Sequence, residues 1–403
     1  MQIGVVGAGP AGLYLCLLLL SKYSKEKIPV HLTLFEANER VGGRTQMGEY
    51  HGRPVVSGAG VVRKDDVRLR KLCRRFRIPL HRFTTHIQYP KPHQSKTLFL
   101  SLLDSFSKKE EEFQSRETFS ENFKRLMGPD VYQDFVEMAG YTDYEHANVY
   151  DTLRDYGWKD NTAGQTMYRI NWNQLTDAML DYLTSTYPPT QFQILLHCPI
   201  TKVSFSKKQQ QFHLSSSSPN LKDVDILFWT TPRPHWKPIL QWIPPTIYQQ
   251  LHGQPFLRAY ADVSDELQLN PKTTTYTTID CPLQKIIPIE PPMYMISYSD
   301  NQRAKKAVKM LKTLEKTTEK KKDDKLIQDP KLFFWPCGTH YFSPSSIRTL
   351  SEREKWLQQA CHPCHPCHPH SSLPLYLAGE GLSTNQGWTE GALESVERVL
   401  SIL

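Results

Sequence analysis

The sequence contains no apolar run of the roughly 18 residues that a membrane-spanning helix requires. The apolar stretch from Leu13 to Leu20 is much shorter, and no basic segment precedes it, as one would in a secretory signal peptide. These absences exclude the usual helical membrane proteins, so we expect no membrane span. They also predict a cytoplasmic location.

The cysteines of this chain do not predict a disulfide framework. Of the eight cysteines, Cys16, Cys73 and Cys198 lie in apolar segments that are typical of buried thiols. The segment Cys361 to His370 repeats Cys, His and Pro, and both Cys and His are zinc ligands. However, a proline in each unit favours an extended low-complexity loop that spreads the ligands apart. We therefore expect adventitious metal binding at most, with a functional metal site as the alternative.

Neither sign of charge dominates, since 49 basic and 41 acidic side chains leave a formal net charge of +8. At 403 residues the chain is longer than one average core, so we expect two lobes. Much of the surplus lies in the lysine-rich segment 305–325, where apolar residues recur at helical spacing: Ala304, Val308, Leu311 and Leu314. We therefore expect a helix with one face packed against the protein and the other face exposed to solvent. A surface for nucleic acid or anionic membranes is the alternative, and we expect no nucleic-acid partner.

A strand, a tight turn and a helix open the chain. Ile3 to Val6 is a short apolar run typical of a buried parallel strand, and an apolar helix is expected from Ala11 to Tyr23. Between them, Gly7, Gly9 and Gly12 form the G-x-G-x-x-G spacing. This arrangement lets backbone N–H groups and the positive end of the helix approach a pyrophosphate.

An acidic residue follows this motif. Val30 to Phe35 is predicted to be a second strand, and it ends at Glu36, close to the ~20-residue separation at which an acid binds a ribose hydroxyl. A carboxylate there would repel the 2′-phosphate of NADP. The pattern therefore predicts a site for NAD or FAD, and a glycine-rich turn without a ligand is the alternative.

The next residues resemble a known family. Segment 36–44, Glu-Ala-Asn-Glu-Arg-Val-Gly-Gly-Arg, is similar to the corresponding segment of the flavin-containing amine oxidoreductases, which include monoamine, polyamine and L-amino-acid oxidases. The resemblance implies FAD, with Gly43 close to the cofactor and Arg44 donating to a phosphate. It also implies that Gly58 and Ala59 pass beside the flavin, although the family often has an acid at the position of Ser57.

The C-terminal region supports the same resemblance. Leu375 to Ala378 is predicted to be a strand, Gly379 to Gly381 a tight turn, and Thr389 to Leu400 a helix. In the family this turn contacts the ribityl chain and the helix start faces the flavin, which implies Glu380 and Thr389 as cofactor contacts. A helix N-terminus is also a preorganised donor for the negative charge of a reduced flavin. A helix that only closes the sheet is the alternative.

Two further segments, Ile194 to Val203 and Asp225 to Pro232, are predicted to be strands. The resemblance implies that Val203 contacts the adenine. We therefore predict an α/β, two-lobed flavoprotein with its substrate cleft between the lobes. Its discontinuous Rossmann-like FAD-binding domain would comprise 1–75, 191–235 and 371–403, and its substrate domain of mixed sheet plus helices 76–190 and 236–370.

The resemblance also implies where a substrate meets the flavin. In monoamine oxidases two aromatic side chains flank the amine, and Trp388 takes the place of one, with core packing as its alternative. Its partner is expected to be His340 or Tyr341. Arg258 stands where the family usually has a lysine that holds a water near flavin N5. Because arginine keeps its charge, it would bind water or a substrate carboxylate, unless the lysine comes from elsewhere.

Monoamine oxidases attach their flavin covalently through a cysteine. At the corresponding position this chain has Thr339, and Cys337 lies two residues away. We therefore predict noncovalent FAD. The predicted reaction is oxidation of an amine or amino acid to an imine by hydride transfer to flavin N5, with reoxidation by O2 and release of H2O2. A related desaturase or protoporphyrinogen-oxidase-type enzyme, and a flavin-binding protein without turnover, are the alternatives.

Overall fold

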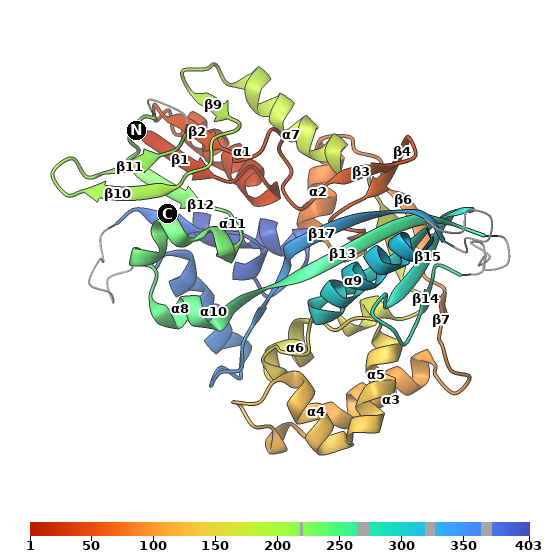
Figure 1. Cartoon of the computed structure of the whole chain (residues 1–403). Coiled ribbons are helices and arrows are strands. Elements are labelled where there is room, and N and C mark those ends of the chain that lie inside the picture. Colours follow the sequence, from red (N-terminus) through yellow and green to blue (C-terminus); the bar gives the residue numbers. More distant parts are fainter. Residues whose placement is uncertain (218–220, 265–273, 319–326, 364–372) are drawn as a thin grey trace.

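The computed structural model describes residues 1–217, 221–264, 274–318, 327–363 and 373–403. Figure 1 shows one sheet near both chain termini, a second sheet of longer strands, and a group of helices below the second sheet. None of the helices in the described ranges has the length and apolar character that crossing a bilayer demands.

The sheet near the termini is parallel, with strand order β18-β12-β1-β2-β9. Its central strand β1 pairs on both sides, so that Ile3 lies opposite Leu32 of β2 and Ile226 of β12. β1 and β2 are buried along nearly their whole length, as expected of strands covered on both faces. The strands are β1 (Gln2–Val6), β2 (His31–Phe35), β9 (Phe192–Leu195), β12 (Ile226–Trp229) and β18 (Leu375–Leu377).

Helices cover this sheet. α1 begins at Pro10, directly after the glycine turn, where a proline is already restricted to a helical φ angle. α1 packs against α7 and α11, and α11 also contacts α2 and α10. The helices are α1 (Pro10–Lys25), α2 (Val67–Arg75), α7 (Trp172–Thr186), α10 (Leu350–Cys361) and α11 (Thr389–Ile402). The predicted strand, turn and helix at each end of the chain are therefore confirmed.

The second sheet has strand order β17-β13-β16-β15-β14-β7, and its long strands β13, β16 and β17 are antiparallel. The strands are β7 (Ile87–Gln88), β13 (Leu251–Val263), β14 (Tyr276–Thr278), β15 (Lys285–Glu290), β16 (Met293–Asp300) and β17 (Ile327–Phe342). Three small sheets accompany it, built from β3 (Met47–Tyr50), β4 (Arg53–Val56), β5 (Val62–Arg63), β6 (His81–Thr84), β8 (Thr166–Arg169), β10 (Lys202–Ser206) and β11 (Gln211–Ser215).

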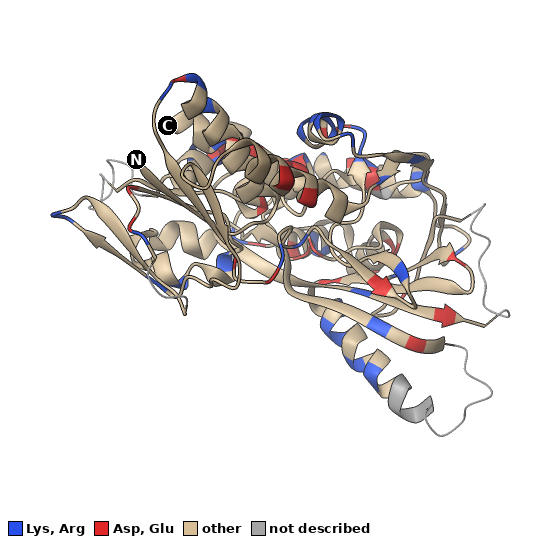
Figure 2. Ribbon diagram, turned by 90° about the horizontal axis from the view of Figure 1, so that it is seen from above, with Lys and Arg blue, Asp and Glu red and all other residues tan. Residues whose placement is uncertain are grey.

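Helix α9 (Asn301–Thr318) packs on the second sheet and carries residues 305–318 of the lysine-rich segment, while residues 319–325 lie outside the described residues. Ala304, Ala307 and Leu311 are buried, while Lys305 and Lys309 are exposed. Figure 2 shows basic residues along this helix, which projects from the rest of the molecule. The predicted packed and solvated faces are confirmed for the described side chains.

The helices between residues 96 and 155 form the group below the second sheet in Figure 1. They share an aromatic core in which Phe99 and Phe135 stack with their ring centroids 5.0 Å apart. They are α3 (Lys96–Ser107), α4 (Phe119–Met127), α5 (Pro129–Ala139) and α6 (Val149–Asp155); α8 (Pro245–Gln250) lies elsewhere, before β13. Together with α7, these four helices supply most of the regular structure of residues 76–190.

One predicted strand is divided. Residues Ile194 to Val203 comprise the end of β9 and the start of β10, and between them His197 has a φ angle of 51°. Pro199 has no N–H to donate to a neighbouring strand, so the β9 ladder cannot continue through it. β10 then pairs with β11 as an antiparallel hairpin.

Only Cys361 to Pro363 of the Cys-His-Pro repeat belong to the described residues, and residues 364–370 lie outside them. Within the described ranges, no group of three or more His, Cys, Asp or Glu side chains is arranged to hold a metal ion.

Candidate active site

A cavity of about 1210 Å³ runs from the carboxyl ends of β1 and β2 to the face of β13, β15 and β16. It is lined by residues from both ends of the chain, including the glycine turn, the start of α11 and the middle of β17. Its volume exceeds the upper end of the ~300–1,000 Å³ typical of small-molecule sites. The cavity is therefore large enough for an extended cofactor together with a small substrate.

The glycine turn shapes one end of the cavity. Gly7 has a φ angle of +104°, and its N–H donates to the carbonyl of Phe35 over 2.8 Å. A Cβ at Gly12 would lie 1.9 Å from the carbonyl oxygen of Gly7, so no side chain fits there. Gly9 differs, because a Cβ on it would meet no atom within 4 Å and the residue lines the cavity. The turn thus leaves an open cradle at Gly9.

Glu36 lies at the end of β2 beside this cradle. It is 6% exposed, lines the cavity, and accepts hydrogen bonds from the N–H of Ala8 at 2.8 Å and the N–H of Asn38 at 3.0 Å. Gly43 is also close, since a Cβ on it would lie 3.4 Å from Cα of Gly9. The structure therefore brings together the predicted contacts from the glycine motif, Glu36 and the Gly-Gly-Arg loop.

Val203 is not brought to the cavity. It is buried in β10, and its carbonyl accepts a hydrogen bond from Nε2 of Gln241 at 3.2 Å. Cys198, Pro199 and Ile200 line the cavity instead. The turn between β9 and β10 causes this difference, because it brings residues 198–200 to the cavity in place of Val203.

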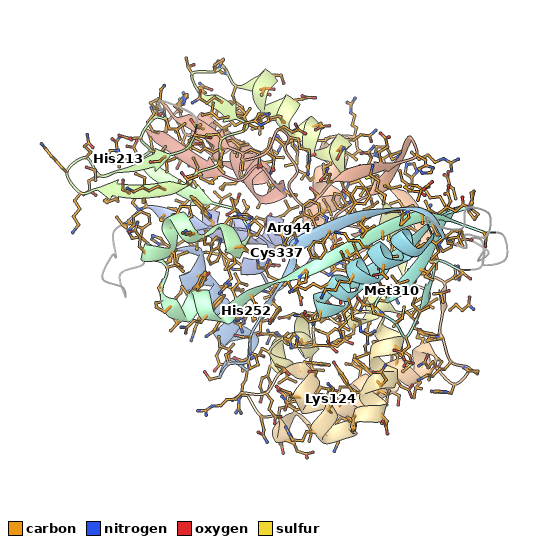
Figure 3. All side chains as sticks on the ribbon, viewed as in Figure 1. Arg44, Lys124, His213, His252, Met310 and Cys337 are labelled. Carbon is orange, nitrogen blue, oxygen red and sulfur yellow. The ribbon has the colours of Figure 1, made fainter. Side chains whose placement is uncertain are left out.

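Arg44 joins the two ends of the chain at the cavity wall. Nη2 donates to Oε2 of Glu380 at 2.8 Å, and Nη1 donates to the carbonyl of Gly338 at 2.8 Å. Figure 3 shows Arg44 and Cys337 close to each other near the centre of the molecule. Arg44 lines the cavity as predicted, but these two contacts tie it to protein groups, so a phosphate contact stays a prediction.

Glu380 is the centre of a buried charged network. Besides Arg44, it accepts hydrogen bonds from the N–H of His340 at 2.9 Å and from Nδ1 of the same ring at 2.9 Å. Burial raises the pKa of Glu380, but the adjacent Arg44 and His340 outweigh burial and hold the pKa well below its usual value. The carboxylate is therefore ionised and fixed in position.

His340 and Tyr341, the predicted aromatic partners of Trp388, lie further along β17 and outside the cavity lining. His340 is 4% exposed, and its Nε2 accepts the N–H of Arg233 at 3.2 Å. Tyr341 stacks on His252 with ring centroids 5.4 Å apart. The structure thus does not bring these two side chains to Trp388, and Thr339 is the nearer β17 residue that lines the cavity.

Trp388 and Thr389 both line the cavity, at the N-terminus of α11. The guanidinium of Arg63 lies 4.0 Å from the centroid of the Trp388 ring and covers one of its faces. Arg63 is itself held by Asp66 at 2.8 Å and Asp160 at 3.2 Å. The indole is therefore supported from behind and contributes a flat wall to the cavity.

Arg258 is 3% exposed and lies against the turn that was predicted to pass beside the flavin. Its Nε donates to the carbonyl of Gly58 at 2.8 Å, and its guanidinium lies 4.3 Å from the ring centroid of Tyr298. Gly58, Ala59 and Arg258 all line the cavity. These three predicted site residues are therefore neighbours.

Sequence reasoning missed a group of cavity residues contributed by β14, β15, β16 and the loop after α5: Tyr141, Asp143, Tyr276, Lys285, Tyr298 and Asp300. Burial lowers the pKa of Lys285 well below its usual value, although Asp300 and Asp143 oppose this effect. Burial and the neighbouring Asp300 raise the pKa of Asp143 to about 7. No motif links these residues, and a lysine at the start of an apolar strand was the only local signal.

Comparison with known proteins gives results of two kinds. A family model for an NAD(P)-binding Rossmann-like domain matches residues 5–76. None of the curated proteins compared with the chain matches it.

Solved structures match over the whole chain. Putrescine oxidase bound to putrescine is 12% identical with a TM-score of 0.69, and the match covers 100% of this chain and 99% of that one. A double mutant of putrescine oxidase has a TM-score of 0.72 at 11% identity, with coverage of 100% and 99%. A protein of Exiguobacterium sp. 255-15, provisionally assigned as a protoporphyrinogen oxidase, is 13% identical with a TM-score of 0.67 and coverage of 100% and 98%.

At these identities the similarity establishes the fold. It confirms the predicted α/β fold class and the predicted resemblance at the level of architecture. The chain has a Rossmann-like nucleotide-binding domain at its N-terminus and, over its full length, the fold shared by putrescine oxidase and the Exiguobacterium protein.

Proposed function

We propose that this chain is an FAD-dependent oxidoreductase that converts an amine or amino acid to an imine in the cavity described above. The observation that carries the proposal is that one cavity joins the glycine turn at Gly9 to Trp388 at the start of α11 and to Arg258. An extended cofactor with a pyrophosphate and a redox ring needs both ends of such a site. The predicted division into a discontinuous FAD-binding domain and a substrate domain is part of this proposal.

The residues present fit FAD. Gly9 leaves an open cradle for a pyrophosphate, because nothing lies within 4 Å of the position of its missing Cβ. Glu36 would accept from a ribose hydroxyl, and its charge disfavours NADP. The N-terminus of α11 at Thr389 supplies a positive helix end, with Glu380 beside it.

When bound, FAD would accept a hydride at N5 and pass the electrons to O2, releasing H2O2. The chain's own side chains would orient the substrate and exclude water. Trp388 offers a flat apolar wall supported by Arg63. A guanidinium carries five N–H donors, so Arg258 can hold the carbonyl of Gly58 and still donate to a substrate carboxylate.

We expect FAD to be bound noncovalently. Cys337 lines the cavity, but its Sγ lies 3.5 Å from Nε2 of His340, and Thr339, at the aligned position, carries no thiol. Precipitating the purified protein with acid should therefore release the flavin into the supernatant. Yellow colour that stays with the polypeptide and disappears in Cys337→Ala would show instead a covalent bond at this cysteine.

The described cysteines favour a reducing compartment. Cys16, Cys73, Cys198, Cys281, Cys337 and Cys361 are all free. Disulfides are rare in cytosolic proteins, which supports the proposed cytoplasmic location.

Substrate panels distinguish this proposal from the two alternatives. The purified protein would be mixed without oxygen with amines, amino acids and saturated precursors of conjugated products. Bleaching of the flavin by an amine or amino acid supports the proposed reaction. Bleaching only by a precursor of a carbon–carbon double bond supports a desaturase or protoporphyrinogen-oxidase type, and no bleaching supports a flavin-binding protein without turnover.

A further inference from the structure

The cavity end formed by β14, β15 and β16 is a cage of tyrosines that already holds an amino group of the chain itself. Nζ of Lys285 lies 3.1 Å from the ring centroid of Tyr141, 4.5 Å from that of Tyr276 and 5.5 Å from that of Tyr298. Lys285 is 1% exposed. Its amino group is therefore enclosed by the faces of these three aromatic rings.

The lysine side chain occupies space that a glycine leaves free. A Cβ on Gly140, which follows α5, would lie 2.5 Å from Cε of Lys285 and 2.7 Å from Cγ2 of Thr278. Any larger residue at position 140 would displace the lysine from the cage. The local packing is thus shaped around the lysine.

Two carboxylates lie at the same end of the cavity. Oδ1 of Asp300 accepts the N–H and hydroxyl of Thr142, whereas Oδ2 is buried without a hydrogen-bond partner among the described residues. The carboxylate of Asp143 accepts the hydroxyl of Tyr156. Tyrosine faces beside the unpartnered Oδ2 of Asp300 form an environment suited to an ammonium group, and a buried carboxylate without a cation is costly.

The cage stands apart from the position proposed for the reaction. Arg258 lies against the turn at Gly58, and its guanidinium is 4.3 Å from the ring of Tyr298, which also borders the cage. Lys285 and Arg258 therefore both lie next to the ring of Tyr298. A substrate whose reacting amine lies near Gly58 would direct its far end toward Lys285.

We propose that Lys285 determines substrate specificity by filling this cage, so that a diamine or polyamine cannot place its second ammonium there. The site then selects amines whose far end is neutral. This inference rests on the proposed function, since it concerns the far end of the same substrate.

The test compares binding of butane-1,4-diamine and butylamine, two probes of equal chain length, by calorimetry without oxygen and with the flavin reduced beforehand by dithionite, so that no turnover occurs. We expect the wild-type protein to bind the diamine no more tightly than butylamine. Lys285→Ala should bind the diamine about 30-fold more tightly than the wild type does, the ratio that one desolvated cation–π contact supplies. Lys285→Met keeps the cage filled and should show little of this gain.

Lys331→Met serves as the control, because Lys331 is an exposed lysine of β17 whose Nζ lies 5.8 Å from the ring of Phe333. It should leave both affinities unchanged. A wild-type protein that prefers the diamine overturns the proposal, even if Lys285→Ala fails to fold. An equal diamine gain in Lys285→Met and Lys285→Ala, or no gain in a folded Lys285→Ala, overturns it too. Failure of every amine to bleach the flavin contradicts the proposed function instead.

Discussion

The variant Gly9→Ala is expected to fold normally and to bind FAD about 10- to 100-fold more weakly. This range corresponds to a loss of ~1–3 kcal/mol of binding free energy, the typical cost of overpacking a site. The backbone of Gly9 has a φ angle of −73°, which alanine adopts without strain. The added methyl group meets no protein atom within 4 Å, so the unliganded fold keeps its packing. It occupies the cradle where a pyrophosphate would approach the backbone.

Equilibrium titration of the apoprotein with FAD measures this effect, and thermal unfolding without FAD checks the fold. Gly12→Ala is the matched comparison, because its Cβ would lie 1.9 Å from the oxygen of Gly7 and should lower the stability of the apoprotein as well. Unchanged FAD affinity in a folded Gly9→Ala would show that the pyrophosphate does not bind at this turn.

Glu380→Gln is expected to lower the free energy of unfolding of the apoprotein by about 3–5 kcal/mol, the usual cost of removing one partner from a buried ion pair. Glu380 is 5% exposed and holds the charged Arg44 at 2.8 Å and the ring of His340 at 2.9 Å. The glutamine would leave the guanidinium of Arg44, which is 25% exposed, and the buried ring of His340 without their carboxylate partner.

Urea unfolding measures this loss, with Asp104→Asn as the control. Asp104 pairs with Lys108 at 2.6 Å, but both side chains are more than half exposed, so its loss should be at most about 1 kcal/mol. Equal effects of the two substitutions would contradict a structural role for the Arg44–Glu380 pair.

The role of the Arg44–Glu380 pair can also be tested by the pH dependence of the protein's stability. Because the pKa of Glu380 is lower in the folded protein than its ordinary 4.5, its contribution is complete above that pH and declines as the pH falls. The difference in stability between the wild type and Glu380→Gln should therefore shrink on acidification below about pH 4.5.

Local sequence patterns predicted the parts of the site that lie in continuous motifs. The glycine spacing around Gly9, the acid at Glu36 and the helix start at Thr389 are each encoded by neighbouring residues with one physical requirement. Their convergence at one cavity follows from the parallel pairing of β1 with β2 and β12, and of β12 with β18.

The substrate end could not be predicted in this way. Lys285, Tyr141 and Asp300 come from three elements whose meeting depends on sheet order and long-range packing. The placement of His340 depends on Glu380, forty positions away, which holds the ring outside the cavity. Patterns with a period of two or 3.6 residues carry no information about such contacts.

We propose that this chain carries FAD in the cavity between Gly9 and Trp388. The most direct measurement is the absorption spectrum of the purified protein, followed by mass identification of the chromophore that it releases. We expect the two-banded spectrum of oxidised flavin, about one FAD per chain, and its loss on dilution of Gly9→Ala. A folded, colourless protein that neither contains nor takes up FAD, or one that releases NAD, would contradict the account.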